Sequence, residues 1–112
     1  MHMIEVAIRP SALDAVKKKM AELGIFGCTA LESKGFGKQK GHTERYRGGR
    51  MDVGFVPKVL LKFAVRSEDL KKAQDAIVSA ARTGNVGDGK MFVYKLDNVM
   101  RIRTGEQDND AL

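Results

Sequence analysis

The stretch MIEVAIR, residues 3–9, alternates apolar and polar side chains. Its apolar members, Ile4, Val6 and Ile8, would all face one side of an extended chain, which predicts a β-strand with one buried face. In residues 11–24 the apolar side chains instead recur every three or four positions, which predicts a helix with one buried side. Those side chains are Leu13, Val16, Met20 and Leu23. The chain therefore begins with a strand and a helix that can pack on each other.

The same two patterns return in the rest of the sequence. Strands are predicted over residues 25–34, 59–65 and 91–96, a second helix over 67–84, and a short terminal strand over 99–103. A strand–helix–strand unit that occurs twice is the element order of ferredoxin-like folds. We therefore predict an α+β, ferredoxin-like double βαβ fold, whose four-stranded antiparallel sheet carries two helices on one face. An open sheet face rich in apolar residues predicts association between subunits.

Single residues predict where the helices begin and end. Ser11, three residues before Asp14, resembles a capping box, and Ser67 is placed to cap the second helix. Gly24 and Gly84 predict the two helix ends, because glycine readily adopts the conformation that follows a last helical turn. Each predicted helix is thus bounded by a hydroxyl residue and a glycine.

Composition limits the class of protein. The 112 residues suffice for one domain, 1–112, and 43% hydrophobic residues can form a modest core. The formal net charge of +6 predicts an anionic partner. No apolar run approaches the roughly 18 residues of a membrane span, and the N-terminus lacks a leader pattern, so we expect a cytoplasmic protein without membrane insertion. The single cysteine, Cys28, is predicted to be a small buried apolar residue.

Residues 35–54 are rich in glycine and show no sustained periodicity, which predicts a long functional loop. Its first part, Gly35 to Gly41, resembles a dinucleotide-binding fingerprint but has one residue too many and does not begin a helix. The glycines still permit a ligand to approach the backbone closely, while Lys38 and Lys40 supply cations. A flexible basic loop is the alternative interpretation. The polar residues 104–112 predict a loose tail.

Two further segments could bind phosphate. Residues 84–90, GNVGDGK, fit the phosphate-loop spacing G-x-x-x-x-G-K, but Met91 stands where a Ser or Thr would hold Mg²⁺. The pattern therefore indicates either a glycine loop with a phosphate-binding lysine or a simple helix end and turn. Arg101 and Arg103 are two residues apart, so in a strand they would form a fork about 7 Å wide that suits a polyphosphate.

Five segments together resemble the PII signal-transduction family, nitrogen regulatory protein P-II. They are KGFGKQKGHTE (34–44), YRG (46–48), PK (57–58), ARTGNVGDGK (81–90) and RIRTGE (101–106). The resemblance implies a cytoplasmic homotrimer that binds ATP or ADP in clefts between subunits. It also names three loops: the T-loop (37–55), the B-loop (82–90), and the C-terminal loop and tail (101–112).

The resemblance further implies roles for individual residues. The nucleotide would be bound by Thr29, Gly35, Gly37, Lys38, Gly87, Asp88, Gly89, Lys90, Arg101 and Arg103. The effector 2-oxoglutarate would bind together with Mg²⁺, with Gln39 as a metal ligand, Lys58 paired with a carboxylate, and Lys40 and Gly41 completing the site. The T-loop would dock on a membrane transporter or a metabolic enzyme through Arg45, Tyr46, Arg47, Arg50 and Met51.

The T-loop departs from the family pattern. Met51 stands where some members carry a modified tyrosine, and Gly49 where others carry a phosphorylated serine. Five basic residues against two acidic ones make the loop unusually positive. Lys62 occupies a place in the adenine pocket where the family commonly has Glu.

The sequence therefore predicts a non-enzymatic regulator of nitrogen metabolism that is driven by ligands alone. A basic ferredoxin-like RNA-binding module is the main alternative, although the aromatic motif of that class is missing. An ATPase is a weaker alternative, because the hydroxyl after Lys90 and a positioned base are both lacking.

Overall fold

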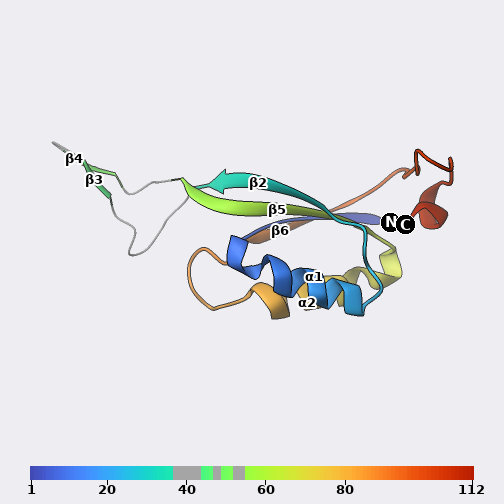
Figure 1. The fold of residues 1–112 in the computed structure, drawn as a ribbon, viewed down its shortest axis with the longest axis horizontal. Helices are drawn as coiled ribbons and strands as arrows, with labels where there is room; N and C mark the ends of the chain where they lie inside the picture. The colour runs from blue at the N-terminus through green and yellow to red at the C-terminus, as the bar shows by residue number, and fades with distance from the viewer. Residues whose placement is uncertain (37–43, 47–48, 52–54) are drawn as a thin grey trace.

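A computed structural model gives the fold of residues 1–36, 44–46, 49–51 and 55–112. In these residues a four-stranded antiparallel sheet of order β2-β5-β1-β6 carries two α-helices on one face (Figure 1). The strands are β1 (His2–Ile8), β2 (Thr29–Gly35), β5 (Val56–Val65) and β6 (Lys90–Lys95), and the helices are α1 (Leu13–Glu22) and α2 (Leu70–Ala81). The predicted ferredoxin-like α+β architecture is confirmed.

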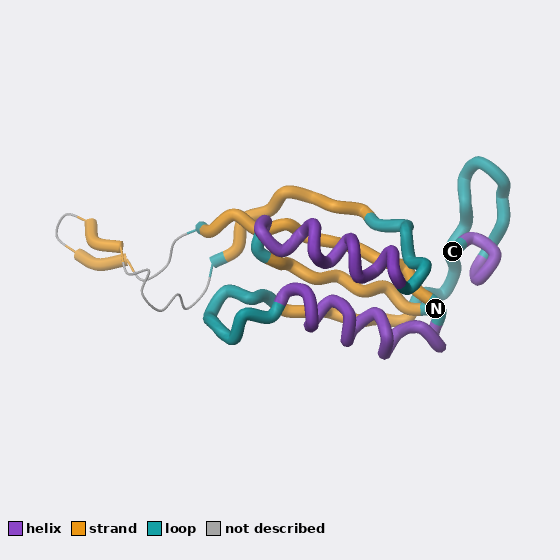
Figure 2. Tube along the Cα trace, turned by 60° about the horizontal axis from the view of Figure 1, so that its bottom comes forward, coloured by secondary structure: helices purple, strands orange, loops and turns teal. Residues whose placement is uncertain are grey.

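The register of the central strands explains the core. Ile4 pairs with Phe63 and Val6 with Leu61, so the alternating apolar residues of β1 and β5 share one sheet face. These side chains are almost completely buried beneath α1 and α2, which lie side by side across the sheet (Figure 2). The helices contribute their predicted apolar sides, of which Val16, Met20, Ala73 and Ile77 are fully buried. Burying such apolar surface is the main force that holds the two layers together.

The helix ends differ from the prediction. Each α-helix is preceded by a single 3-10 turn, Pro10–Ala12 or Ser67–Asp69, and no side chain caps either helix. The capping roles predicted for Ser11 and Ser67 are therefore wrong; the Ser67 hydroxyl instead accepts a hydrogen bond of 2.9 Å from the N-terminal ammonium. Gly24 does follow α1 with a φ of +78°, whereas α2 ends at Ala81, before Gly84.

The strand boundaries also shift. Strand β2 begins at Thr29 rather than residue 25, and β5 begins at Val56, before Pro57. Proline fits in this inner strand because β1 pairs with β5 only from Val59 onward, so Pro57 faces a partner strand on one side only. Within the predicted long loop, β3 (Glu44–Tyr46) pairs with β4 (Gly49–Met51) as an antiparallel ladder. A loop without regular structure was thus an incomplete prediction.

The C-terminal region folds back instead of forming a strand and a loose tail. Residues 102–104 form a turn, Met100 bridges to Gln107, and Asp108–Ala111 form a 3-10 helix. The Asp108 amide donates to the Val99 carbonyl at 2.7 Å, which ties the end of the chain to the segment after β6. The strand predicted over residues 99–103 is wrong because these residues bond to the tail and not to the sheet.

Cys28 is exposed in the loop before β2, so its predicted burial is wrong for this chain. None of the helices in the described ranges is long and apolar enough to cross a membrane.

Candidate functional site

The residues predicted to bind nucleotide lie at opposite ends of the sheet. The B-loop joins α2 to β6 at the end where β2 leads into the T-loop, whereas the C-terminal segment lies beyond the other end (Figures 1 and 2). Thr29 and Gly35, the first and last residues of β2, are separated by about 20 Å at the usual rise of a strand. One chain therefore presents two separate half-sites.

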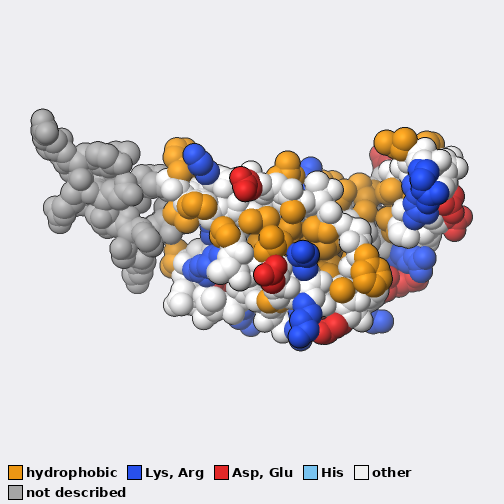
Figure 3. Space-filling view, in the orientation of Figure 1, with side chains coloured by type: hydrophobic (Ala, Val, Ile, Leu, Met, Phe, Trp, Pro, Cys, Tyr) orange, Lys and Arg blue, Asp and Glu red, His pale blue; other side chains and the backbone are white. Residues whose placement is uncertain are grey.

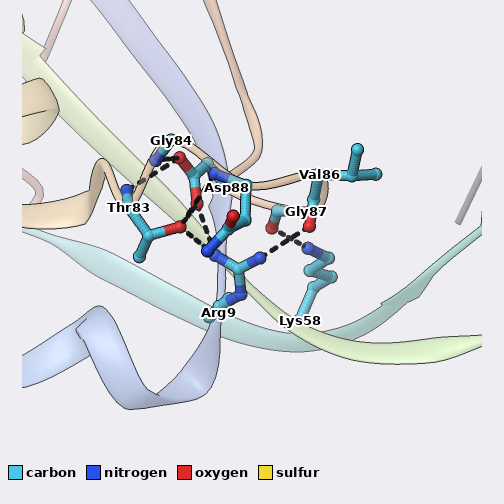
Figure 4. Close-up of polar contacts among 8 residues, drawn as sticks. Arg9, Lys58, Thr83, Gly84, Val86, Gly87 and Asp88 are labelled. Carbon is cyan, nitrogen blue, oxygen red and sulfur yellow. Dashed lines mark hydrogen bonds and ion pairs between the residues drawn. The ribbon is translucent and has the colours of Figure 1, made fainter. Parts of the chain in front are cut away.

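At the first end, Asp88 is the centre of a network that folds the B-loop (Figure 4). One carboxylate oxygen accepts hydrogen bonds from the backbone amides of Thr83 and Gly84, at 2.8 and 2.9 Å. The other accepts from the Thr83 hydroxyl and forms an ion pair with Arg9. The hydrogen bonds from the side chain and backbone of Thr83 are the main reason that the pKa of the Asp88 carboxyl lies far below its usual range. Asp88 is therefore a structural anion inside the loop.

Two cations from elsewhere in the chain, Arg9 directly after β1 and Lys58 on β5, hold backbone carbonyls of the same loop. Arg9 donates to the Val86 carbonyl at 2.7 Å, and Lys58 donates to the Gly87 carbonyl at 2.5 Å. Burial lowers the pKa of the Lys58 ammonium, and the positive charge of Arg9 lowers it further. We refer to Arg9, Lys58, Thr83, Asp88 and the Val86 and Gly87 carbonyls as the B-loop cluster. Both cations are thus paired with groups of the B-loop in this structure.

Glycine is required at two positions of the B-loop. Gly89 has a φ of +113°, and a Cβ built on it would lie 1.8 Å from the Ala7 carbonyl oxygen of β1. Gly87 has a φ of +103°, and its Cβ would lie 2.9 Å from a guanidinium nitrogen of Arg9. No larger residue fits Gly89 without moving the backbone, so the loop lies directly on β1. At both positions the space that a Cβ would take is occupied by other atoms of this chain, so the two glycines let the loop pack on β1 and on Arg9.

Several predicted residues join this end of the sheet. Lys90, the first residue of β6, is exposed immediately after the loop. Gly35 ends β2 beside Lys58, whose Cγ would lie 3.4 Å from a Cβ at Gly35. The structure therefore brings six predicted ligand-binding residues to one end: Gly35, Lys58, Gly87, Asp88, Gly89 and Lys90.

The second half-site is a groove at the other end of the sheet. Its volume is about 780 Å³, and Thr29, Lys62 and Arg101 are among its lining residues. The Arg101 guanidinium donates to the Glu106 carboxylate at 2.9 Å, inside a segment whose surface mixes acidic and basic side chains (Figure 3). Arg103 is exposed in the turn that follows Arg101. We refer to this groove and the two arginines as the C-terminal half-site.

The predicted arginine fork is wrong, because Arg101 and Arg103 do not share a strand face: residues 102–104 form a turn. Lys90 starts β6, whereas both arginines follow the far end of that strand. Within one chain, Lys90 and the two arginines are therefore separated by the length of β6.

The open sheet face carries a polar cluster beside this groove. The Glu5 carboxylate accepts a hydrogen bond of 2.5 Å from the Tyr94 hydroxyl and lies 3.4 Å from the Lys62 ammonium. The bond from Tyr94 lowers the pKa of the Glu5 carboxyl, and Lys62 lowers it further. The same bond raises the pKa of the Tyr94 hydroxyl. Lys62 thus lines the groove while it is paired with an acid of the sheet.

Some predicted residues lie outside the described ones. They are Gly37, Lys38, Gln39, Lys40, Gly41 and Arg47. Arg45 and Tyr46 lie on β3, and Arg50 and Met51 on β4. Groups of three or more His, Cys, Asp or Glu side chains that could hold a metal ion do not occur in the described ranges. The described part of the predicted effector site is Lys58, and the predicted metal ligand, Gln39, lies outside the described residues.

Sequence reasoning missed Arg9 and Thr83, which complete the B-loop cluster. Arg9 lies 79 positions from its partner Asp88, whereas Thr83 lies only five positions from it. The only local signal was a cation at the end of the first predicted strand, directly before Pro10. That signal is too common to identify a site.

Comparison with known proteins places the chain in a family. The family described as Nitrogen regulatory protein P-II matches residues 1–106. Relatives include the nitrogen regulatory proteins P-II of Azospirillum brasilense, 49% identical, and Rhizobium etli, 48% identical. The nitrogen regulatory protein P-II 1 of Escherichia coli K12 is 47% identical. Each alignment covers 100% of this chain and 100% of the relative. The chain therefore belongs to the P-II family of nitrogen regulatory proteins.

Proposed function

We propose that this nitrogen regulator is a non-enzymatic, cytoplasmic sensor that binds ATP or ADP between the subunits of a homotrimer. It also binds 2-oxoglutarate with Mg²⁺, and it controls a membrane transporter or metabolic enzyme through its T-loop. The observation that carries the proposal is the pair of half-sites at opposite ends of one sheet. Lys90 with the glycines of the B-loop forms one, and Thr29 with Arg101 forms the other.

A single nucleotide can use both half-sites only if they come from different copies of the chain. Head-to-tail contact between identical subunits closes into a ring when the rotation allows it. The open sheet face offers a surface for that contact, because Leu31, Phe92 and Tyr94 are 46%, 57% and 43% exposed there. These observations support clefts in which the B-loop of one subunit meets the C-terminal half-site of the next.

Nucleotide calorimetry with three proteins tests the phosphate contacts. We expect Lys90→Ala and Arg103→Ala each to lower the affinity for ATP by about ten- to a hundredfold, because a charge-assisted contact to phosphate is worth about 1.5–3 kcal/mol. Arg101→Ala should also lower the affinity for ATP. Wild-type affinity in the Arg101 and Arg103 variants would remove the C-terminal half-site from the proposal.

Mixed trimers test whether the two half-sites come from neighbouring subunits. Lys90→Ala and Arg103→Ala chains with different tags are expressed together, and trimers that carry both tags are purified. Each mixed ring contains one cleft with an intact B-loop and an intact C-terminal half-site. We therefore expect one site of wild-type affinity per mixed trimer and none in either parent. Absence of that site, with trimers present, would contradict clefts shared between subunits.

The effector is expected to need both a cation and a metal, since burying a dicarboxylate without them is costly. Lys58 supplies the cation, and Gln39 is the proposed metal ligand. We expect 2-oxoglutarate to bind only when ATP and Mg²⁺ are present, and Lys58→Met to abolish the binding. Titrating 2-oxoglutarate into the wild type and into Lys58→Met, each with and without ATP and Mg²⁺, measures both effects. Binding without nucleotide would contradict the mechanism.

The RNA-binding alternative has one supporting observation, the exposed aromatic rings of Phe92 and Tyr94 on the open sheet face. Glu5 lies on the same face, and its carboxylate would repel a phosphate backbone. We therefore assign this face to subunit contact. Fluorescence anisotropy with labelled single-stranded RNA should show no binding at physiological salt, and tight binding would favour the alternative.

Control by ligands alone, without covalent modification of the T-loop tip, is part of the proposal. A uridylyl or phosphoryl group needs a hydroxyl acceptor, and residues 48–52 contain none. Intact-mass spectrometry of protein from nitrogen-starved and nitrogen-replete cells should therefore show one unmodified mass. An adduct located within residues 48–52 would overturn this part.

The positive T-loop should favour an acidic partner surface, so Arg50→Glu and added salt should both weaken docking. Partner affinity unchanged by both would contradict this docking mode.

A further inference from the structure

Arg9 connects the end of β1 to three points of the B-loop. Its guanidinium forms an ion pair with Asp88, donates to the Thr83 hydroxyl at 3.2 Å, and donates to the Val86 carbonyl at 2.7 Å (Figure 4). The side chain is 29% exposed, so solvent only partly competes for these contacts. One arginine therefore fixes both ends of the segment from Thr83 to Asp88.

We propose that Arg9 is a positioning residue for phosphate binding: it holds the B-loop backbone so that the Gly87 N–H faces the nucleotide. The inference deepens the proposed function and rests on it. Arg9 acts here through Asp88 and the Val86 carbonyl, and its two terminal nitrogens already have partners within the loop. It is therefore distinct from Lys90, which is exposed and free to reach a phosphate.

The planar peptide group explains how this contact orients a donor. In a trans peptide the C=O of one residue and the N–H of the next point in opposite directions. Arg9 draws the Val86 carbonyl inward, so the Gly87 N–H is directed away from the guanidinium. Lys58 holds the Gly87 carbonyl in the same way, and the Asp88 N–H that follows it donates to the Asn85 carbonyl at 3.4 Å inside the loop. The two cations thus fix consecutive peptide groups, and the Gly87 N–H is the donor that they leave directed away from the loop's own contacts.

The loop needs such an anchor because its glycines restrict the backbone conformation only weakly. Gly84, Gly87 and Gly89 all adopt positive φ, and glycine samples many other conformations at little cost. Without Arg9, the Asp88 carboxylate would keep its bonds to Thr83 and Gly84 but lose its tie to β1. The loop would then retain its local turn while its position relative to the sheet became variable.

Arginine suits the task better than lysine. Its planar fork donates to a carboxylate, a hydroxyl and a carbonyl at once, whereas an ammonium on a shorter reach acts as a point charge. Arg9→Lys should therefore restore part of the affinity that Arg9→Met loses. A residue that served only to fill space would be replaced equally well by methionine.

The test compares ATP with adenosine, which lacks phosphate, on trimeric protein. We expect Arg9→Met to weaken ATP binding about tenfold, because the Gly87 N–H loses the orientation in which it can donate to a phosphate oxygen. Adenosine affinity, measured by competition, should stay within twofold of the wild type. Lys72→Met on exposed α2 surface is the matched control for removal of a cation and should change neither value.

A double-mutant cycle and hydrogen exchange give independent readouts. If Arg9 acts through Asp88, the Arg9→Met, Asp88→Asn double variant should bind ATP no more weakly than the weaker single variant. Amide exchange should accelerate in residues 83–89 of Arg9→Met and stay unchanged in β1 and β5, with the melting temperature of the core preserved. Arg9→Lys provides a folded variant for all measurements if Arg9→Met does not form trimers.

Three outcomes would overturn the inference while the proposed function stands: wild-type ATP affinity in Arg9→Met, equal losses for ATP and adenosine, or additive losses in the double variant. Failure of the wild-type protein itself to bind ATP would overturn the proposed function and the inference with it. Weaker ATP binding with unchanged adenosine binding, partial rescue by lysine and faster exchange confined to the B-loop would support Arg9 as the positioning residue.

Discussion

The B-loop and the C-terminal segment both carry residues predicted to hold phosphate, yet the fold fixes them in different ways. The B-loop is tied to strands far away in sequence, since Arg9 and Lys58 lie 79 and 29 positions from their partners Asp88 and Gly87. In the C-terminal segment, Arg101 bonds to Glu106 and to the Ala111 carbonyl, within ten positions. One loop is part of the sheet's architecture, and the other is a local turn.

This difference indicates which half-site is preformed. Long-range contacts to β1 and β5 hold the B-loop in place within one chain, so its backbone donors are oriented before a ligand arrives. The C-terminal half-site exposes Arg103 and pairs Arg101 with an acid of the same segment. In the proposed site, these cations would exchange a local partner, or solvent, for the phosphate.

The largest effect is expected from Gly89→Ala. Its Cβ would lie 1.8 Å from the Ala7 carbonyl oxygen, at a φ of +113°. Overpacking costs about 1–3 kcal/mol and the strained backbone about 1–2 kcal/mol, so the free energy of unfolding should fall by about 3 kcal/mol. Urea unfolding measures this change.

Gly105→Ala is the matched control in the C-terminal segment. It also has a positive φ, +74°, but nothing lies within 4 Å of the new Cβ. Only the backbone strain of about 1–2 kcal/mol should then appear. Equal costs at the two glycines would show that the B-loop does not rest on β1 as described.

Most of the fold could be predicted from the sequence because the apolar periodicity is strong. The alternation of Ile4, Val6 and Ile8 matches the buried face of β1, and the spacing of Val16 and Met20 matches the buried side of α1. Helix ends were less predictable, because the Ser67 hydroxyl accepts a hydrogen bond from the N-terminal ammonium, 66 positions away, and does not cap the helix. Local sequence cannot report a contact of that kind.

The candidate site was predictable in its motifs but not in its arrangement. The segment GNVGDGK correctly indicated a glycine loop followed by an exposed lysine. It could not indicate that Asp88 would pair with Arg9 or that the two arginines after β6 would lie at the other end of the sheet. The first depends on the packing of β1 against the B-loop, and the second on the length of a strand. Both are properties of the assembled fold.

The dependence of stability on pH probes how Asp88 anchors the B-loop. The pKa of the Asp88 carboxyl is lowered in the folded protein, mainly by the hydrogen bonds from Thr83. An Asp in an unfolded chain has a pKa of about 3.9. The folded state thus binds this proton less readily than the unfolded state. The contacts of Asp88 therefore contribute stability above the unfolded pKa, and this contribution is lost as the pH falls through the folded pKa.

Carboxyl carbon NMR measures that titration directly. We expect the midpoint of Asp88 to lie well below about 3.9, with the Thr83 and Gly84 amides protected from exchange until it is reached. Thr83→Val removes the hydroxyl donor, keeps the side-chain shape, and should move the midpoint upward. An unshifted midpoint in the wild type would mean that Asp88 does not organise the loop in solution.

The smallest effect is expected from Glu106→Gln in the C-terminal segment. The Arg101–Glu106 pair is 2.9 Å long, but its side chains are 38% and 46% exposed, and such surface pairs contribute about 0–1 kcal/mol. The free energy of unfolding should therefore change by less than about 1 kcal/mol, and 1 M salt should remove most of that difference. Because the substitution frees Arg101 from a competing carboxylate, ATP affinity should rise by up to about fivefold, the equivalent of 1 kcal/mol. Weaker ATP binding in Glu106→Gln would instead show that Glu106 orients Arg101 for the phosphate. The C-terminal half-site would then be preformed like the B-loop, and the contrast between the two regions would disappear.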